Sequence, residues 1–234
     1  MNLRMTLRDR QPGASLARII FFVFARGLTR LILQVFFGAK GEGTENVPQR
    51  GPLVIVANHQ SYLDPPAVGS FVGSRHTEFL ARASLFKYKP FAWLISLCNS
   101  VPIKDDQGDA AAIREILSRL EMGRAVLIFP EGSRSPDGVM HEFKRGAALI
   151  VKRAKCPVLP AAITGAYERW PEWRKWPRLS GPRVLVKYGK VIPYEELMKD
   201  GSERAMKRLA EEVGRLKAEL DQSRHSTAAS PSAR

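Results

Sequence analysis

The stretch PLVIVANHQSYLDPP, residues 52–66, places a run of apolar residues directly before a polar turn that ends in two prolines. A short apolar run bounded by turn residues is typical of a buried strand, which we predict over residues 52–58. Asp64 is predicted to be the N-cap of a helix, because Pro65 and Pro66 follow it and proline is favoured in the first helical turn. The stretch therefore predicts a strand, a turn and a helix in succession.

The remainder of the chain repeats this alternation. Further strands are predicted at 77–81, 101–104, 125–130, 157–163 and 183–191, and helices at 108–122, at 144–154 and from 194 to about 220, the last divided near Gly201. Alternating strands and helices predict an α/β fold, a single domain whose mostly parallel or mixed central sheet is flanked by helices. We place this domain at 39–220, after an N-terminal membrane-interface helix region (1–38) and before a polar tail (221–234) that we expect to be disordered.

The chain is strongly basic. Its 234 residues include 37 Lys and Arg against 23 Asp and Glu, a formal net charge of +14. Such an excess indicates a polyanionic partner, either nucleic acid or an anionic membrane surface. The two cysteines, Cys98 and Cys156, lie far apart in apolar settings and lack metal-ligand spacing. We therefore predict two reduced, buried thiols and no metal site.

Residues 16–37, LARIIFFVFARGLTRLILQVFF, combine apolar and basic side chains. Arg18, Arg26 and Arg30 interrupt the segment, so no unbroken run reaches the roughly 20 apolar residues of a membrane span. On a helical wheel the three arginines fall in one half, and apolar residues dominate the other. The pattern predicts an amphipathic helix that lies in the membrane interface. The alternative is a helix packed on the domain's own core.

The turn NHQSYLD, residues 58–64, carries a histidine and an aspartate five positions apart. On a continuous helix the two side chains would diverge by about 140°. A turn, however, can fold the carboxylate of Asp64 back onto the imidazole of His59. Such a pair fixes the tautomer and leaves the outer nitrogen to take a proton from an alcohol. The alternative, for His59 taken alone, is a structural histidine.

A second polar segment, FPEGSRS at residues 129–135, follows another predicted strand. Gly132 would let the backbone approach a ligand closely, and Arg134 offers a planar fork suited to phosphate. Glu131 could position the ligand or tether Arg134. The alternative is a turn with a surface salt bridge.

The two segments together resemble the motifs of a known family. NHQSYLD resembles the NHxSxxD signature, and FPEGSRS the FPEGTRS signature, of the glycerolipid acyltransferases, and the 1-acylglycerol-3-phosphate acyltransferases are the most similar group. VPIK at 101–104 falls where that family carries a short phosphate-binding block, and residues 143–163 are similar to its FKxGA stretch and the strand that follows. The resemblance covers residues 40 to about 195.

By that resemblance His59 is the general base and Asp64 its orienting partner. The substrate-binding residues that it implies are Glu131, Gly132, Ser133, Arg134 and Lys104, to which we add Lys144 as a further phosphate ligand. Two positions depart from the family pattern. Ser133 replaces Thr and keeps the hydroxyl, whereas Lys104 replaces the usual Arg and exchanges a bidentate fork for a point charge. The second change leaves the head group of the acceptor open.

The reaction that the resemblance implies moves a fatty acyl group from acyl-CoA or acyl carrier protein onto the free hydroxyl of a lysophospholipid, foremost 1-acyl-sn-glycerol-3-phosphate. The sequence contains no GxSxG motif, so we expect direct attack on the thioester, without an acyl-enzyme or a cofactor. The expected location is peripheral, at the cytoplasmic face of the cell membrane. The alternatives are the same chemistry on a lyso-ornithine lipid or another lysolipid, and a non-catalytic basic module that binds lipid or nucleic acid.

Three tryptophans are interleaved with basic residues in YERWPEWRKWPR, residues 167–178. Tryptophan favours the head-group level of a bilayer and the cations suit anionic lipid, so we predict a second membrane contact here and no nucleic-acid partner. The alternatives are a base-stacking loop for single-stranded nucleic acid and a tryptophan cluster packed on the protein itself.

Overall fold

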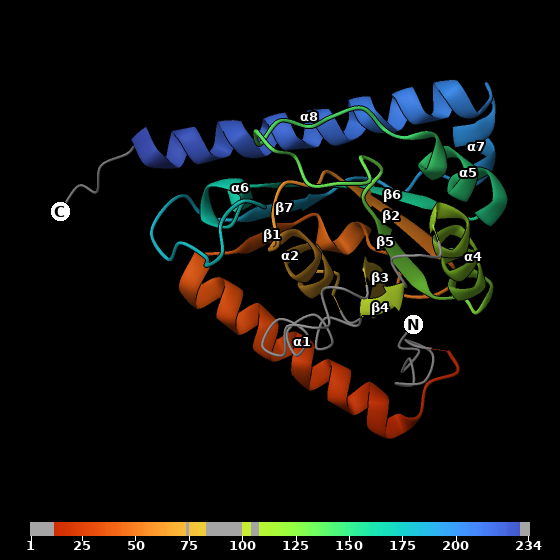
Figure 1. The fold of residues 1–234 in the computed structure, drawn as a ribbon, viewed down its shortest axis with the longest axis horizontal. Coiled ribbons are helices and arrows are strands. Elements are labelled where there is room, and N and C mark those ends of the chain that lie inside the picture. The colour runs from red at the N-terminus through yellow and green to blue at the C-terminus, as the bar shows by residue number, and fades with distance from the viewer. Residues whose placement is uncertain (1–11, 74, 83–99, 104–107, 230–234) are drawn as a thin grey trace.

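A single mixed sheet organises the computed structural model, which describes residues 12–73, 75–82, 100–103 and 108–229 (Figure 1). Within these residues seven strands join in the order β1-β7-β6-β2-β5-β3-β4. Their bounds are Lys40–Glu42 (β1), Leu53–Ala57 (β2), Thr77–Arg82 (β3), Ser100–Ile103 (β4), Ala125–Ile128 (β5), Val158–Thr164 (β6) and Leu185–Tyr188 (β7). The fold class predicted from the sequence, an α/β domain with a mostly parallel or mixed sheet, is confirmed.

The centre of the sheet is parallel. Strand β2 lies between β5 and β6 and runs parallel to both, with Ile55 opposite Leu127 on one side and opposite Leu159 on the other. Strands β3 and β4 continue the parallel arrangement beyond β5, whereas β7 pairs antiparallel with β6 and parallel with β1. The carboxyl ends of β2, β5 and β6 therefore meet at one edge of the sheet, where ligands bind in open α/β sheets.

Helices cover both faces of the sheet (Figure 1). The helix bounds are Leu16–Phe37 (α1), Asp64–Ser70 (α2), Gly108–Glu121 (α4), Arg145–Ala154 (α5), Ala166–Arg169 (α6), Tyr194–Met198 (α7) and Ser202–Ala229 (α8), with a short 3-10 turn at Thr44–Asn46. The side chains of successive β2 residues pack on opposite faces of the sheet. Leu53 and Ile55 pack in the cluster that contains α1 and α2, whereas Val54 and Val56 pack in the cluster that contains α4, α5 and α8. This alternation explains why β2 is an unbroken apolar run.

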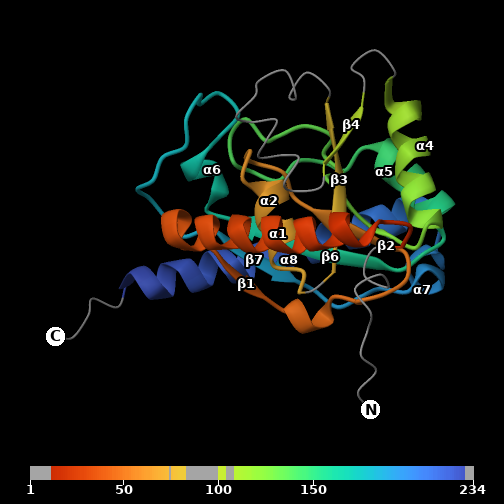
Figure 2. The same cartoon turned by 90° about the horizontal axis from the view of Figure 1, so that it is seen from below.

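Helix α1 has the bounds expected from the sequence and lies across one face of the domain (Figure 2). One of its sides packs on the domain through residues that are at most 7% exposed: Ile19, Phe22, Ala25, Thr29, Leu33 and Phe37. Another side, which we call the α1 apolar face, consists of Leu16, Ile20, Phe21, Phe24, Leu31, Val35 and Phe36, each 45–68% exposed. Helix α1 is thus partly a core helix, which was one alternative drawn from the sequence, and partly an exposed apolar surface.

Two boundaries differ from the sequence-based prediction. Asp64 is the first residue of α2 rather than its N-cap, because its carboxylate turns back to the preceding turn. The predicted disordered tail from residue 221 is wrong as far as Ala229, because α8 continues to that residue. Asp221 and Arg224 both bond Thr164 at the end of β6, and these contacts stabilise the extra helical turns. Residues 230–234 lie outside the described part.

Strand β1 and the 3-10 turn were not predicted, and neither was α6. The expected strand at 183–191 is shorter in the structure, where β7 ends at Tyr188. Cys98 lies outside the described residues. Cys156 is a free, buried thiol as predicted, and burial raises its pKa to about 11.

Candidate active site

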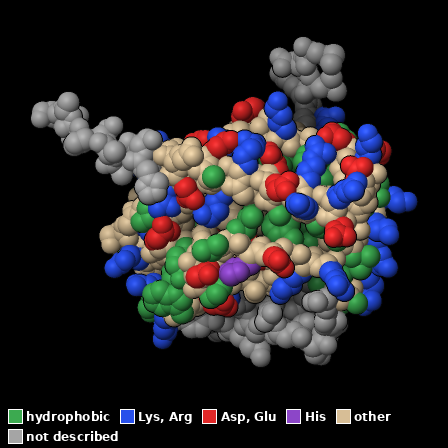
Figure 3. Space-filling model, turned by 90° about the horizontal axis from the view of Figure 1, so that it is seen from above, with side chains coloured by type: hydrophobic (Ala, Val, Ile, Leu, Met, Phe, Trp, Pro, Cys, Tyr) green, Lys and Arg blue, Asp and Glu red, His purple; other side chains and the backbone are tan. Residues whose placement is uncertain are grey.

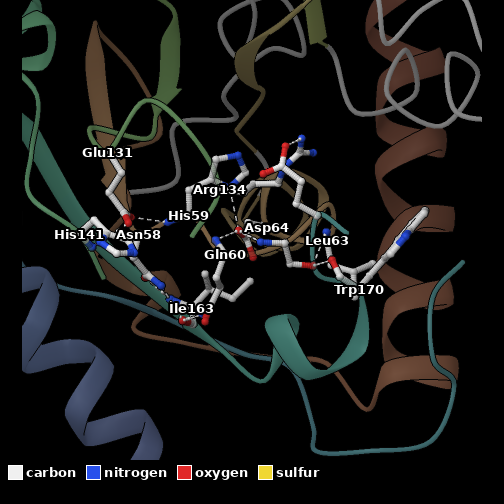
Figure 4. A network of polar contacts seen from close by, with 12 residues as sticks. Asn58, His59, Gln60, Leu63, Asp64, Glu131, Arg134, His141, Ile163 and Trp170 are labelled. Carbon is white, nitrogen blue, oxygen red and sulfur yellow. Dashed lines mark hydrogen bonds and ion pairs between the residues drawn. The ribbon is translucent and has the colours of Figure 1, made fainter. Parts of the chain in front are cut away.

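Two turns carry the polar residues of the site, one after β2 and one after β5. Because these strands are parallel neighbours, His59 and Glu131 leave the sheet at the same edge. The two turns are bonded to each other: the Ser135 N–H donates to the His59 carbonyl at 2.8 Å. The predicted association of the two motifs is therefore present in the fold (Figure 4).

His59 and Asp64 form the pair expected from the sequence. His59 Nδ1 lies 2.8 Å from Asp64 Oδ2, and the aspartate is fully buried. The same oxygen accepts the main-chain N–H groups of Gln60 and Ser61 at 2.6 and 2.7 Å. Because this oxygen acts as an acceptor toward both N–H groups, it favours the imidazole tautomer that carries its proton on Nδ1. This tautomer leaves Nε2 as the proton-accepting nitrogen.

The imidazole of His59 contacts Asp64 through its edge and an aromatic ring through its face. It stacks on the ring of Phe129 with the centroids 4.0 Å apart and the planes inclined by 16°. The side chain is 17% exposed, so solvent or a substrate reaches part of it. On either side of His59 the turn is fastened to β6: Asn58 exchanges two hydrogen bonds with the main chain of Ile163, and Gln60 donates to the Ile163 carbonyl. The imidazole is thereby preorganised, as a general base requires.

The Glu131 carboxylate is buried and both of its oxygens are used by main-chain donors. Oε1 accepts the His59 N–H at 2.6 Å and Oε2 accepts the His141 N–H at 2.9 Å. Burial raises the pKa of Glu131, and these two N–H donors oppose that effect. Glu131 does not tether Arg134, which was one possibility drawn from the sequence. It instead fixes the backbone that carries the histidine.

Gly132 and Lys144 are close neighbours. Gly132 has a φ of +73°, and a Cβ placed on it would lie 3.0 Å from Lys144 Cδ and 3.1 Å from Nζ. The glycine therefore provides both a backbone conformation that side chains disfavour and the room for the lysine. Lys144 lies directly before α5 and is exposed. Its ammonium group thus stands beside the second motif, where we expected a phosphate ligand.

Arg134, the cation of the second motif, is held in place by two contacts. Its guanidinium lies over the ring of Tyr62, 3.9 Å from the centroid, and donates to Glu172 Oε1 at 2.7 Å. Tyr62 belongs to the turn between His59 and Asp64, so the arginine is anchored to the turn that carries both of these residues. Ser133 is exposed, and Lys104 lies outside the described residues, so its predicted role stays a prediction.

A loop after α6, residues 170–182, adjoins the site, and we call it the tryptophan loop. The Trp170 carbonyl accepts hydrogen bonds from Ser61 Oγ at 2.7 Å and from the Tyr62 N–H at 3.3 Å. Arg169 is buried, and its guanidinium donates to the carbonyls of Arg178, Leu179, Gly181 and Pro182. The loop is therefore a fixed wall of the site, and it exposes Trp173, Trp176 and Leu179 by 59–68%.

Sequence reasoning missed several residues of this site. Phe129, Tyr62 and Glu172 contact His59 or Arg134, yet their sequence positions give no sign of it, because the contacts join segments that are distant along the chain. Asn58 was noticed only as part of a motif, although it fastens the turn to β6. Among the described residues, no group of three or more His, Cys, Asp or Glu side chains could hold a metal ion.

Comparison with known proteins agrees with this geometry. The Acyltransferase family model matches residues 39–164, which span β1 to the end of β6. The chain belongs to the acyltransferase family, as the two motifs had indicated. It is 31% identical over 209 residues to the 1-acyl-sn-glycerol-3-phosphate acyltransferase of Streptococcus pneumoniae, an alignment that covers 87% of this chain and 75% of that protein.

Two proteins of Pseudomonas aeruginosa are also similar. One, a 1-acyl-sn-glycerol-3-phosphate acyltransferase, is 34% identical over 161 residues; the other, a lyso-ornithine lipid O-acyltransferase, is 29% identical over 161 residues. The chain spans 60% of the length of each. Among solved structures, the 1-acyl-sn-glycerophosphate (LPA) acyltransferase of Thermotoga maritima matches with a TM-score of 0.69 and 28% identity, covering 87% of this chain and 81% of that one.

Proposed function

We propose that this acyltransferase moves a fatty acyl group from a thioester donor onto the free hydroxyl of 1-acyl-sn-glycerol-3-phosphate, which yields phosphatidic acid. The observation that carries the proposal is the contact between His59 Nδ1 and the buried Asp64 carboxylate, in a turn that also carries the partner of Arg134. The names of the relatives support the acceptor.

In the proposed reaction His59 Nε2 takes the proton of the acceptor hydroxyl. The hydroxyl oxygen attacks the thioester carbonyl carbon, the new C–O bond forms and the C–S bond breaks. The imidazolium, stabilised by Asp64, returns its proton to the departing thiolate, so the enzyme ends in its starting state. General-base catalysis of this kind contributes about 10²- to 10⁴-fold to the rate.

The acceptor phosphate is proposed to bind near Arg134 and Lys144, with Lys104 as a third cation. Arginine offers a fork suited to two phosphate oxygens and lysine a point charge. Both described cations belong to the second motif or to the helix start beside it, next to the catalytic turn. Glu131 and Gly132 are proposed to shape this subsite through the backbone, and Ser133 to line it.

We propose that the protein works on a membrane, as a peripheral enzyme of the cytoplasmic face. The α1 apolar face and the exposed side chains of the tryptophan loop support this, since exposed apolar surfaces of this kind suit the bilayer interface. The tryptophan loop lies next to the end of α1, because Arg169, which donates to the carbonyls of that loop, places its guanidinium 5.7 Å from the centroid of the Phe37 ring. Among the described residues, Ile19–Phe37 is the one segment apolar and long enough to cross a membrane, and 28% of it is buried in the domain.

Anionic lipid is the polyanion that we propose for this basic protein. On the face over α8, cationic and acidic side chains are mixed, so no positive patch dominates there (Figure 3). The net charge of +14 therefore does not mark that face as a surface for nucleic acid.

A second candidate function is the same chemistry on a lyso-ornithine lipid. The lyso-ornithine lipid O-acyltransferase of Pseudomonas aeruginosa supports it by similarity. The pairing of Arg134 with Glu172 supports it too, because it places a positive and a negative charge side by side at the site. An acceptor screen on neutral vesicles, with acyl-CoA and acyl carrier protein as donors and mass spectrometry as readout, tests both functions. Phosphatidic acid as the main product supports the first function, an ornithine lipid supports the second, and no acylated product with either donor refutes both.

A further inference from the structure

Arg134, the proposed phosphate ligand, is already paired with a carboxylate. Its NH2 group donates to Glu172 Oε1 at 2.7 Å. The arginine side chain is 17% exposed, whereas that of Glu172 is 50% exposed. Because the guanidinium is mostly covered by protein, the half-exposed carboxylate occupies part of the approach to it from solvent. An incoming head group therefore meets a negative charge beside the positive one.

The position of Glu172 is set by the main chain around it. Trp170, two residues before Glu172, is bonded through its carbonyl to Ser61 in the turn between His59 and Asp64, and its indole Nε1–H donates to the Arg174 carbonyl at 3.1 Å. The Arg174 N–H in turn donates to the Pro171 carbonyl at 3.1 Å, which closes a tight turn around Glu172. The main chain that carries Glu172 is thus held in place beside Arg134.

A phosphate monoester carries up to two negative charges at neutral pH, and a carboxylate beside it is repulsive. The same carboxylate attracts a head group that carries a cation. We infer that Glu172 is a specificity-determining residue of the acceptor site: its carboxylate competes with a phosphate for Arg134 and favours head groups that include a positive charge. This inference rests on the proposed function, because it takes Arg134 to be the phosphate ligand.

The Glu172→Gln variant isolates the charge of this residue. Glutamine keeps an oxygen that can accept the Arg134 hydrogen bond, so the arginine stays in place over Tyr62 while the negative charge is lost. If Glu172 acted only by positioning Arg134, the variant would leave the affinity for the acceptor unchanged. If its charge matters, the variant will bind a phosphate more tightly.

The test measures the Kd of 1-acylglycerol-3-phosphate and of a lysophosphatidylcholine in neutral detergent micelles by calorimetry, together with the KM for the phosphate acceptor. Glu172→Gln should lower the Kd and the KM of the phosphate acceptor about 3- to 10-fold, as expected for removal of one neighbouring like charge. The Kd of the choline lipid should stay constant or rise. In the Arg134→Gln background, the further change Glu172→Gln should have a smaller effect on the phosphate acceptor, because the competition for Arg134 is then absent.

Glu168→Gln is the matched control, because Glu168 is exposed, lies in α6 four residues earlier, and pairs with Arg224 rather than Arg134. It makes the same change in net charge and should leave both affinities unchanged. The inference is overturned if Glu172→Gln leaves the phosphate affinity unchanged or lowers it, or if Glu168→Gln tightens it equally. A wild-type protein that neither binds nor acylates the phosphate acceptor refutes the proposed function instead.

Discussion

The carboxylate of Glu131 accepts the main-chain N–H of His59 at 2.6 Å, and so joins the second motif directly to the first. Its other oxygen accepts the His141 N–H, and the side chain is 3% exposed. A buried carboxylate that serves two backbone donors is a structural clamp. Because Glu131 bonds the main chain of His59, we expect it to position the proposed general base.

Glu131→Gln tests this clamp. Glutamine supplies one acceptor oxygen, but its amide group must then face the other N–H donor, so we expect a loss of about 1–3 kcal/mol in the free energy of unfolding. We also expect kcat to fall at least about tenfold with a smaller change in KM, because a slight shift of His59 lengthens the path of the proton. Urea unfolding and steady-state kinetics measure both effects. Glu142→Gln, at an exposed position nearby, serves as the control; equal values for the two variants would contradict the clamp.

Gly132→Ala tests the need for glycine beside Lys144. The residue has a φ of +73°, and an added Cβ would lie 3.0 Å from Lys144 Cδ. We expect a loss of about 1–2 kcal/mol in stability and a higher KM for the phosphate acceptor, because the backbone is strained and the lysine is displaced. Gly214→Ala in the middle of α8 should instead stabilise the protein slightly, since alanine favours helix. A Gly132→Ala variant with wild-type KM and stability would show that neither effect operates.

The α1 apolar face predicts how the protein binds membranes. Phe24 is 68% exposed at the centre of that face. Phe24→Glu should weaken cosedimentation with anionic vesicles about tenfold or more, because burial of a phenylalanine side chain contributes about 1.5–3 kcal/mol. Leu149→Glu makes the same change on α5, in the opposite helix layer, and should have little effect. Equal vesicle binding by the two variants would exclude α1 as the contact surface.

Cys156 predicts an alkaline loss of stability. In the unfolded chain the thiol ionises near its ordinary pKa of 9.0, whereas burial raises the pKa to about 11 in the folded protein. The folded state keeps the proton longer, so stability that is fully present below pH 9 is lost as the pH rises toward 11. At pH 10.5 the loss should be about 2 kcal/mol. Urea unfolding at pH 8 and 10.5 should show this loss in wild type relative to Cys156→Ala, and parallel curves for the two proteins would contradict it.

The parts of the fold predicted from the sequence are those with a local signal. The apolar runs of β2 and β5 and the turn residues after them locate the strands and both motifs. Strand β1, Lys40–Glu42, has no apolar pattern and exists because it pairs with β7, so its sequence could not reveal it. The end of α8 was missed for a similar reason, since polar residues such as Asp221 and Arg224 find partners in β6 and α6.

For the site, too, only the residues that belong to a local motif were predicted. His59, Asp64 and Arg134 were identified by the resemblance of their two motifs to a known family, which does not point to the residues that orient them. The stacking of His59 on Phe129 and the pairing of Arg134 with Glu172 join segments through the sheet, and a single sequence does not record which segments become neighbours. The prediction that Asp64 is an N-cap was wrong, because its carboxylate bonds groups of the turn before it, including the His59 imidazole, rather than the N–H groups of the helix after it.

The central claim is that His59 and Asp64 act as one unit that removes the acceptor proton. The most direct measurement is kcat for acyl transfer to 1-acylglycerol-3-phosphate by wild type, His59→Ala, Asp64→Asn and the double variant, each checked for folding by circular dichroism. We predict that His59→Ala lowers kcat by about 10²- to 10⁴-fold, and that Asp64→Asn adds no further loss in the His59→Ala background. A folded His59→Ala variant that retains a wild-type kcat would contradict the account.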